Sequence, residues 1–213
     1  FVNRNHSKKL LRALAKEDVR WFTESDLSIA RDDELLGLMR DSGCAQVLIG
    51  FESPSRETLH GVEIRNDWKA RQYDQYMSAI ERIQGHGISV NGCFVLGLDG
   101  TGVNSFQAVR DFVGESGLHD VQVTVQTAFP NTPLYQRLKG SGRIIHDQAW
   151  ELCTLFDVNF IPDRMSVEAL ETNFRWLISE LYSREETQRR KSYFFQQLRE
   201  ARRPQPVPLG QAL

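Results

Sequence analysis

Residues 43–53 read GCAQVLIGFES, and the apolar run QVLIGF (residues 46–51) within them predicts a buried strand. Three similar runs predict three more strands: VRWFT (19–23), ISVNGCFVLGL (88–98) and VQVTVQTAF (121–129). Amphipathic segments separate these runs, and strands that alternate with helices favour a parallel sheet joined by right-handed crossovers. The sequence therefore predicts an α/β fold.

The segments between the strands carry helix signals. Asp32 and Asp33 can act as N-caps of a helix that buries Leu35 and Met39, and Gly43 follows it as a stop signal. We expect the other helices of this part at residues 8–16, 67–84 and 105–115. Each of the first three strands is thus followed by a helix, as in parallel barrels.

The number of strand–helix units limits the fold further, because the first 130 residues hold too few for a closed barrel. We divide the chain into a partial parallel (β/α) barrel at residues 1–130, a mainly helical C-terminal extension at residues 131–203 and a loose tail at residues 204–213. Within the extension, PNTPLY (130–135) is typical of turns. We expect two helices after it, at residues 166–182 and 184–202.

Composition excludes several classes of protein. The 26 basic and 28 acidic side chains give a net charge of −2, which argues against nucleic acid as the main partner. No apolar stretch approaches the roughly 18 residues that a membrane span needs. Three cysteines are too few for a disulfide framework and favour a reducing, cytoplasmic location. Since position 1 is not Met, we expect a fragment of a longer polypeptide.

Acidic, hydroxyl and amide groups recur where the expected strands end. These positions are TES (23–25), GFES (50–53), GLDG (97–100) and QT (126–127). Parallel barrels build their active sites from the loops at the carboxyl ends of their strands. We therefore expect a binding site at this rim.

Individual rim residues have alternative interpretations that the sequence leaves open. The Glu24 carboxylate could accept hydrogen bonds from the two hydroxyls of a ribose, or it could be solvated. Ser53 could line a pocket or cap the segment that follows it. Asn91 and Gln126 could contact a substrate inside the barrel or be satisfied core amides.

Glycines and cysteines of the strands are equally ambiguous. Gly50 and Gly97 fit either a close approach to a ligand or tight packing. The run GLDGTG (97–102) lacks the G-x-G-x-x-G spacing and a suitable Lys, so we reject a phosphate-binding loop. Cys44 and Cys93 lie in apolar contexts typical of core thiols.

Several segments, found in order along the chain, carry a resemblance to a known family. FTES (22–25), GCAQVLIGFES (43–53) and GISVNGCFVLGLD (87–99) resemble the fourth, fifth and sixth strands of the barrel of radical SAM enzymes. The later segments PNTPLY (130–135), GR (142–143) and NFIP (159–162) resemble a C-terminal extension of the cobalamin-binding subgroup. FVNRN (1–5) resembles the end of the third strand. The resemblance implies the C-terminal half of a TIM-type barrel of the radical SAM kind.

The same resemblance implies the chemistry. Family members reductively cleave S-adenosylmethionine (SAM) at a [4Fe–4S] cluster, and the resulting 5′-deoxyadenosyl radical drives methyl transfer or rearrangement of a small-molecule or lipid-like substrate. Cobalamin is a further cofactor in the subgroup. By resemblance, the SAM-binding positions are Glu24, Ser25, Gly50, Glu52, Ser53 and Gly97. The expected substrate contacts are Asn91, Asp99 and Gln126.

The chain departs from the family at its cluster motif. Family members hold the cluster with C-x-x-x-C-x-x-C, whereas Cys44, Cys93 and Cys153 are 49 and 60 residues apart. The five histidines, His6, His60, His86, His119 and His146, show no ligand spacing either. We therefore expect no metal ligands in this chain, cluster ligands in a missing N-terminal part, and no activity of the chain alone.

Two other functions remain open. A degenerate half-barrel could serve as a non-catalytic binding or assembly module. An unrelated parallel barrel could use Glu24 and Glu52 as an acid–base pair. The basic segment 184–203, with its aromatic run YFF (193–195), could suggest nucleic acid, but we expect a helix that packs its aromatic side chains on the barrel.

Overall fold

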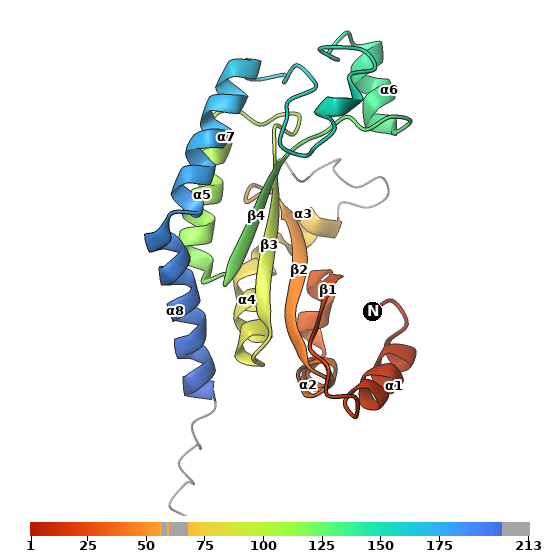
Figure 1. The fold of residues 1–213 in the computed structure, drawn as a ribbon, viewed down its shortest axis with the longest axis vertical. Helices are drawn as coiled ribbons and strands as arrows, with labels where there is room; N and C mark the ends of the chain where they lie inside the picture. The colour runs from red at the N-terminus through yellow and green to blue at the C-terminus, as the bar shows by residue number, and fades with distance from the viewer. Residues whose placement is uncertain (57–58, 60–67, 202–213) are drawn as a thin grey trace, which may run out of the picture.

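Four parallel strands form one sheet in the order β1-β2-β3-β4 (Figure 1). The computed structural model describes residues 1–56, 59 and 68–201. The strands are β1 (Trp21–Ser25), β2 (Cys44–Glu52), β3 (Ser89–Leu96) and β4 (Asp120–Val125). The predicted α/β fold with a parallel sheet is confirmed, because each strand pairs in parallel with the next one along the chain.

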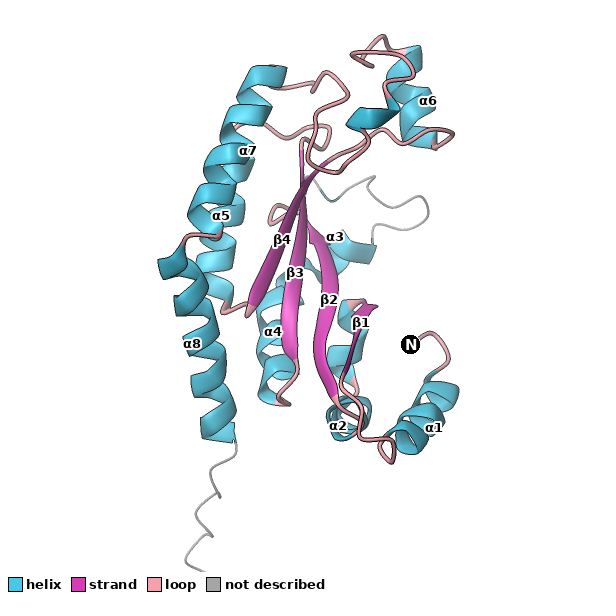
Figure 2. Ribbon diagram, viewed as in Figure 1, coloured by secondary structure: helices cyan, strands magenta, loops and turns pink. Residues whose placement is uncertain are grey.

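Helices precede the first strand, connect the strands and follow the last one (Figure 2). They are α1 (Arg4–Leu14), α2 (Asp33–Asp41), α3 (Trp68–Gln72), α4 (Tyr76–Gly85), α5 (Asn104–Ser116), α6 (Pro133–Gly140), α7 (Val167–Leu181) and α8 (Arg184–Ala201). Helices α2, α4, α5, α7 and α8 contact the strands, and the buried side chains of β2 and β3 alternate with half-buried ones. Within the described residues no helix packs on the other face of the sheet, which we call the open face (Figure 1).

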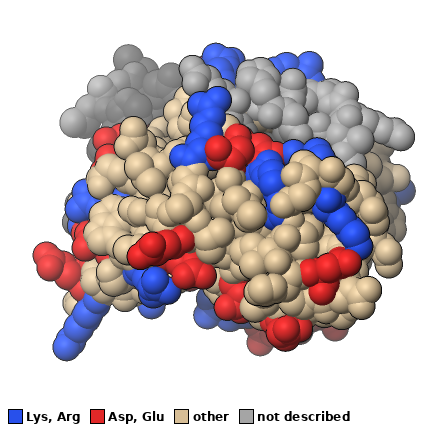
Figure 3. All heavy atoms as spheres, turned by 90° about the horizontal axis from the view of Figure 1, so that it is seen from above, with Lys and Arg blue, Asp and Glu red and all other residues tan. Residues whose placement is uncertain are grey.

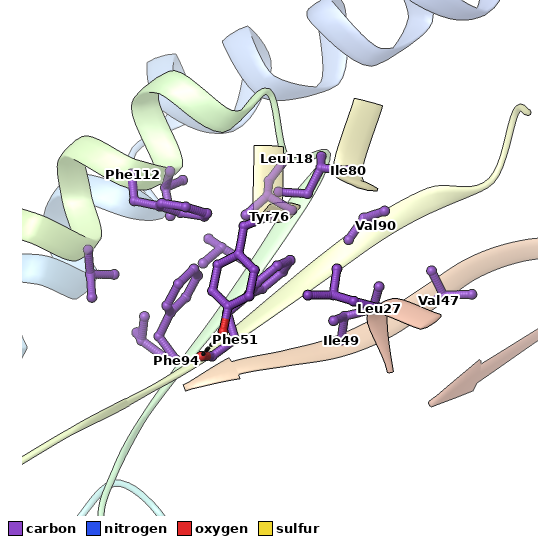
Figure 4. Packing of buried hydrophobic residues seen from close by; sticks show 14 of the residues in the cluster. Leu27, Val47, Ile49, Phe51, Tyr76, Ile80, Val90, Phe94, Phe112 and Leu118 are labelled. Atoms are coloured by element: carbon purple, nitrogen blue, oxygen red, sulfur yellow. Dashed lines mark hydrogen bonds between the residues drawn. The ribbon is translucent and has the colours of Figure 1, made fainter. Parts of the chain in front are cut away.

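The core is centred on four aromatic rings between the sheet and its helices (Figure 4). Phe51 of β2 lies with its ring centroid 4.8 Å from that of Tyr76 and 5.7 Å from that of Phe94. Phe112 of α5 lies 5.6 Å from Phe94 and 5.8 Å from Phe51, centroid to centroid. Offset and edge-to-face aromatic pairs are favourable beyond their buried area. The cluster therefore fixes α4 and α5 against β2 and β3.

Most predicted elements occur, with shifted ends. The first strand lies two residues later than expected, and the last ends at Val125 because the chain leaves the sheet there. The helix predicted over 67–84 is α3 and α4 joined by a 3₁₀ turn at Tyr73–Gln75, and Asp67 lies outside the described residues. The helix predicted at 8–16 begins earlier, since the side chain of Asn3 accepts a hydrogen bond from the His6 N–H and caps it.

One prediction was wrong: PNTPLY contains the start of helix α6. The Thr132 hydroxyl accepts a hydrogen bond from the Tyr135 N–H at 3.2 Å, and Pro133 is the first helical residue. Proline is well tolerated there, because its missing N–H would have no partner inside the helix. The extension thus has three α-helices in its described part, where we expected two.

The last two helices follow the prediction closely. Ser166 caps α7 by accepting the Ala169 N–H at 3.0 Å. In the aromatic run of α8, Phe194 is buried against His119 at a centroid distance of 4.8 Å, whereas Tyr193 and Phe195 are 47% and 50% exposed, so the expected packing holds for one of the three rings. The end of the predicted second helix and the tail at 204–213 lie outside the described residues. None of the helices described has both the length and the apolarity to cross a bilayer.

The aromatic cluster yields a stability prediction. Phe51→Ala should lower the free energy of unfolding of the 213-residue chain by about 3–5 kcal/mol, since it empties space at the centre of the core. Phe22→Ala is the matched control, because Phe22 of β1 is 73% exposed, and it should change that free energy by less than about 0.5 kcal/mol. Urea unfolding followed by circular dichroism measures both. Equal losses in the two variants would contradict the placement of the core.

Candidate functional site

The open face brings several predicted site residues together. Glu24 is paired in register with Leu48, and Leu48 with Asn91 of β3. One step further along, Gly50 is paired with Cys93. Side chains alternate between the two faces of a sheet, so Glu24, Gly50 and Asn91 all lie on the open face.

Ser25 does not join this group. It follows Glu24 in β1, so the alternation of the strand turns it toward the opposite face. Its hydroxyl donates to the Asp26 carbonyl at 3.4 Å. The expected role of Ser25 in binding SAM stays a prediction, and the geometry of β1 places Glu24 better for it.

Glu52 ends β2 in a strained conformation. Its φ is +63°, a left-handed backbone that is uncommon for residues other than glycine. The register with β3 shifts between Gly50 and Glu52, which marks a bulge, and the Ser53 N–H bonds to the Phe51 carbonyl at 2.8 Å. Bulges and strained residues are common beside active sites, where they redirect a side chain.

A lysine that the sequence analysis did not single out reaches this residue. The Lys69 ammonium from α3 forms an ion pair with Oε1 of Glu52. No motif signalled it, because the two residues are 17 positions apart in different elements. The pair weakens the alternative in which Glu24 and Glu52 act as an acid–base pair, since Glu52 has a cationic partner of its own.

Gly50 makes room for this ion pair. A Cβ at position 50 would lie 2.6 Å from Oε1 of Glu52 and 3.1 Å from Nζ of Lys69. Real Cβ atoms do not approach a carboxylate oxygen so closely, so a side chain here would displace the pair. Gly50 therefore allows a close approach, and the groups that approach it are the Glu52 carboxylate and the Lys69 ammonium of the protein itself.

Two cysteines of the sheet, Cys44 and Cys93, are free thiols with a raised pKa. Burial raises the pKa of Cys44 to about 12. Burial also raises the pKa of Cys93 to about 12, with the nearby carboxylates of Glu52 and Glu24 adding to the shift. Metal ligation requires the thiolate. The prediction of a core thiol is confirmed for Cys44, which is buried, whereas Cys93 is half-buried on the open face.

Asn91 and Gln126 each bury a side-chain oxygen without a hydrogen-bond partner among the described residues. Such an acceptor costs about 1–3 kcal/mol unless a water, a ligand or another part of the protein satisfies it. Within the described part of the chain, the side-chain oxygens of both amides thus lack the partner that a satisfied core amide would have. Their expected contact with a substrate stays a prediction, and the unpaired oxygens are in keeping with it.

Asp99 is engaged by the C-terminal extension. Its carboxylate forms ion pairs with Arg137 and with Nη2 of Arg143, the latter at 2.8 Å. Burial alone would raise the pKa of Asp99, but hydrogen bonds from the two arginines hold it below its ordinary value. The substrate contact expected for Asp99 stays a prediction, and the structure gives the residue a structural partner on each oxygen.

The loop around Asp99 is fixed to the extension at two further points. A Cβ at Gly97, which has a φ of +83°, would lie 3.2 Å from Phe160 and from Leu170. The Gly100 N–H donates to both carboxylate oxygens of Asp163, at 3.0 and 3.2 Å. Packing and turn geometry thus account for Gly97, the second of the two interpretations that the sequence left open.

Ser53 is buried, and one of its hydrogen bonds is local. Its hydroxyl accepts a hydrogen bond from the Ser55 N–H at 3.1 Å, so it closes a turn directly after β2. Residues 57–58 and 60–67, which follow that turn and include His60, lie outside the described residues. The role of Ser53 in binding SAM stays a prediction.

The carboxyl ends of all four strands point to one end of the molecule, which also carries α6 (Figure 1). Figure 3 views that end and shows acidic and basic side chains lying side by side around uncharged surface. A wide cavity of about 650 Å³ lies at the opposite end, lined by residues such as Phe22, Gln46 and Phe195. Because the predicted polar groups cluster on the open face and at the carboxyl ends, we place the candidate site there. Among the described residues, no three His, Cys, Asp or Glu side chains are grouped so as to hold a metal.

Comparisons with known proteins find a family model and several proteins that are similar to this chain in sequence. Residues 132–211 match a family model described as a domain of unknown function (DUF4070). The chain is 28% identical over 174 residues to the bacteriochlorophyllide d C-12(1)-methyltransferase of Chlorobaculum tepidum. This match covers 82% of this chain and 37% of that protein. It is 27% identical over 124 residues to the hopanoid C-2 methylase of Rhodopseudomonas palustris. This match covers 58% of this chain and 23% of that protein.

A solved structure supports the fold. The archaeal Elp3 of Methanocaldococcus infernus with an N-terminal deletion matches with a TM-score of 0.52 and 16% identity, over 76% of this chain and 32% of that one. At this identity the likeness concerns the fold alone. The chain spans about a third of the length of the bacteriochlorophyllide methyltransferase and of the solved structure, and less of the hopanoid methylase.

The contacts of Asp99 predict a pH-dependent attachment of the extension. A carboxyl whose pKa is lowered by folding stabilises the protein above its unfolded pKa of about 3.9, and that stability is lost as the pH falls through the folded value. Hydrogen exchange of residues 132–165 should therefore accelerate as the pH approaches that lower value, after correction for intrinsic rates.

Arg143→Ala should accelerate the same exchange at neutral pH, because Asp99 loses one of its two arginine partners. Arg175→Ala is the control: Arg175 is 69% exposed and its pair with Glu171 is 3.9 Å long, so exchange should not change. Similar exchange in all three proteins would show that Asp99 does not hold the extension.

Proposed function

We propose, from the premise that this chain is related to methyltransferases of the radical SAM class, that it is part of an enzyme that methylates a small-molecule or lipid-like substrate. In this proposal the chain supplies the C-terminal half of the barrel and the extension. The observation that carries it is the open face of the parallel sheet, where Glu24, Gly50 and Glu52 lie on the same face as Asn91 and Cys93.

The residues of the open face fit SAM. Glu24 offers a carboxylate with two acceptor oxygens, which suits the two neighbouring hydroxyls of the ribose. Glu52 offers a second carboxylate, which suits an amino group, and it is held in a strained turn of the kind found at binding sites. Bound SAM would supply the methyl group or the adenosyl radical used in the reaction.

The residues of this chain do not fit an iron–sulfur cluster. The three cysteines lack the C-x-x-x-C-x-x-C spacing, and among the described residues no three His, Cys, Asp or Glu side chains are grouped so as to hold a metal. We therefore propose that the cluster ligands belong to residues outside this chain, and we derive no step through the cluster. Cobalamin is proposed on the likeness to the cobalamin-binding subgroup alone.

The chain's own side chains would bind and orient. Glu24 and Glu52 would accept hydrogen bonds from SAM, while the buried oxygens of Asn91 and Gln126 would accept them from the substrate after a small side-chain rotation. The extension, held by Asp99, would cover the carboxyl ends of β3 and β4 and help to exclude water. Methyl transfer is favoured over rearrangement because the relatives are named as a methyltransferase and a methylase.

A second candidate is a non-catalytic binding or assembly module. The wide separation of the three cysteines favours it, since this chain carries no C-x-x-x-C-x-x-C motif. The partner in both proposals is the remaining part of the same polypeptide, which would cover the open face. The predicted cytoplasmic location is part of the proposal.

SAM binding tests the proposal. The full polypeptide that contains this chain should bind SAM, and Glu24→Gln should weaken binding about tenfold, because a neutral amide replaces a carboxylate that accepts two hydrogen bonds. Glu34→Gln is the control, since Glu34 lies on α2 and pairs with Lys8 and Arg12. Isothermal titration calorimetry measures the three affinities. Equal affinities would remove Glu24 from the site.

Reconstitution separates the two candidates. After anaerobic treatment with iron and sulfide, the full polypeptide should become brown and cleave SAM under reduction, whereas the 213-residue chain should stay colourless. A full polypeptide that stays colourless and lacks a cysteine triplet would favour the non-catalytic module.

A further inference from the structure

The ion pair between Lys69 and Glu52 joins a helix to the strained end of β2. The Lys69 ammonium bonds to Oε1 of Glu52, and both side chains are about one-fifth exposed, at 21% and 20%. A partly buried pair is less screened than one in open solvent, so its geometry constrains both side chains. The pair lies on the open face, above Gly50.

The backbone on both sides of the pair is held by one buried hydroxyl. Tyr76, which is 1% exposed, places its hydroxyl 3.4 Å from the Phe51 carbonyl and 3.4 Å from the Lys69 carbonyl. Phe51 immediately precedes Glu52. The hydroxyl has a single proton, which the two carbonyls share, and in this way the tyrosine links the start of α3 to the end of β2.

Glycine at position 50 is the third part of the arrangement. A Cβ there would lie 2.6 Å from the Glu52 carboxylate and 3.1 Å from the Lys69 ammonium. The carboxylate thus lies close to a strand that carries no side chain at this point.

We propose that Lys69 is a positioning residue, which holds the Glu52 carboxylate over the bare backbone of Gly50 so that its second oxygen, Oε2, is presented to SAM. The inference rests on the proposed function, since it takes Glu52 as a SAM-binding residue. It adds to the site a residue, Lys69, that no motif identifies. It also explains why position 50 is glycine, since a side chain there would occupy the space of the oriented carboxylate.

Three variants of the full polypeptide test the proposal through SAM affinity. Lys69→Met should weaken SAM binding about tenfold, because the carboxylate is no longer oriented, and Lys69→Arg should restore affinity to within about threefold, because a guanidinium can also pair with Oε1. Gly50→Ala should weaken binding as Lys69→Met does, although it keeps the lysine, because the added methyl group displaces the pair. Thermal unfolding of each variant shows whether it is folded.

Matched controls isolate the effect. Lys139→Met also breaks a lysine–carboxylate pair, the one with Asp147 beside α6, and should leave SAM affinity unchanged. Gly37→Ala adds a methyl group where no other atom lies within 4 Å, and should likewise leave it unchanged. In a double-mutant cycle, Lys69→Met should have little further effect in a Glu52→Gln background, since the two residues act as one unit.

The outcomes separate this inference from the proposed function. If the unchanged polypeptide does not bind SAM, the proposed function fails. If it binds SAM and folded Lys69→Met binds equally well, the role of Lys69 is overturned while the proposed function stands. If Lys69→Met weakens binding equally with and without Glu52→Gln, the lysine acts on SAM independently of Glu52, which also overturns the positioning role.

Discussion

The alternation of side chains at the end of β2 is the constraint on which the candidate site depends. Phe51 packs into the aromatic cluster with Tyr76, Phe94 and Phe112, and it is fully buried. Because neighbouring residues of a strand point to opposite faces, anchoring Phe51 on the helix side forces Gly50 and Glu52 onto the open face. The hydrophobic core thus positions the polar groups on the other side of the same strand.

The extension depends on the sheet in a different way. Polar groups attach it to the loop after β3: Asp99 pairs with Arg137 and Arg143, and Asp163 accepts a hydrogen bond from the Gly100 N–H. Asn159 adds a two-point contact, since its side chain accepts the Ala128 N–H at 3.1 Å and donates to the Ala128 carbonyl at 3.2 Å. Such directional bonds fix the orientation of the extension relative to the ends of β3 and β4.

Sequence reasoning succeeded where the signal is local and failed where partners are distant. The cap at Asp32 is confirmed because a cap bonds to a backbone N–H three residues away. Helix α6 was missed although Thr132 and Pro133 carry the same kind of local signal, because the two prolines of the segment were interpreted as turn residues. Ser25 and Asp99 were assigned to the site because they lie at strand ends. The alternation of β1 turns Ser25 to the other face of the sheet, and Asp99 pairs with Arg137 and Arg143 of the extension.

The sequence by itself determined the α/β fold, the approximate strand positions and the polar character of the strand ends, because apolar runs and their spacing are local properties of the chain. Only the tertiary structure decided which of those polar groups meet. Lys69 reaches Glu52 across 17 residues, and Arg137 and Arg143 reach Asp99 across 38 and 44. Pairings over such separations depend on how strands and helices pack, and that packing is set by the aromatic core rather than by any motif around the charged residues.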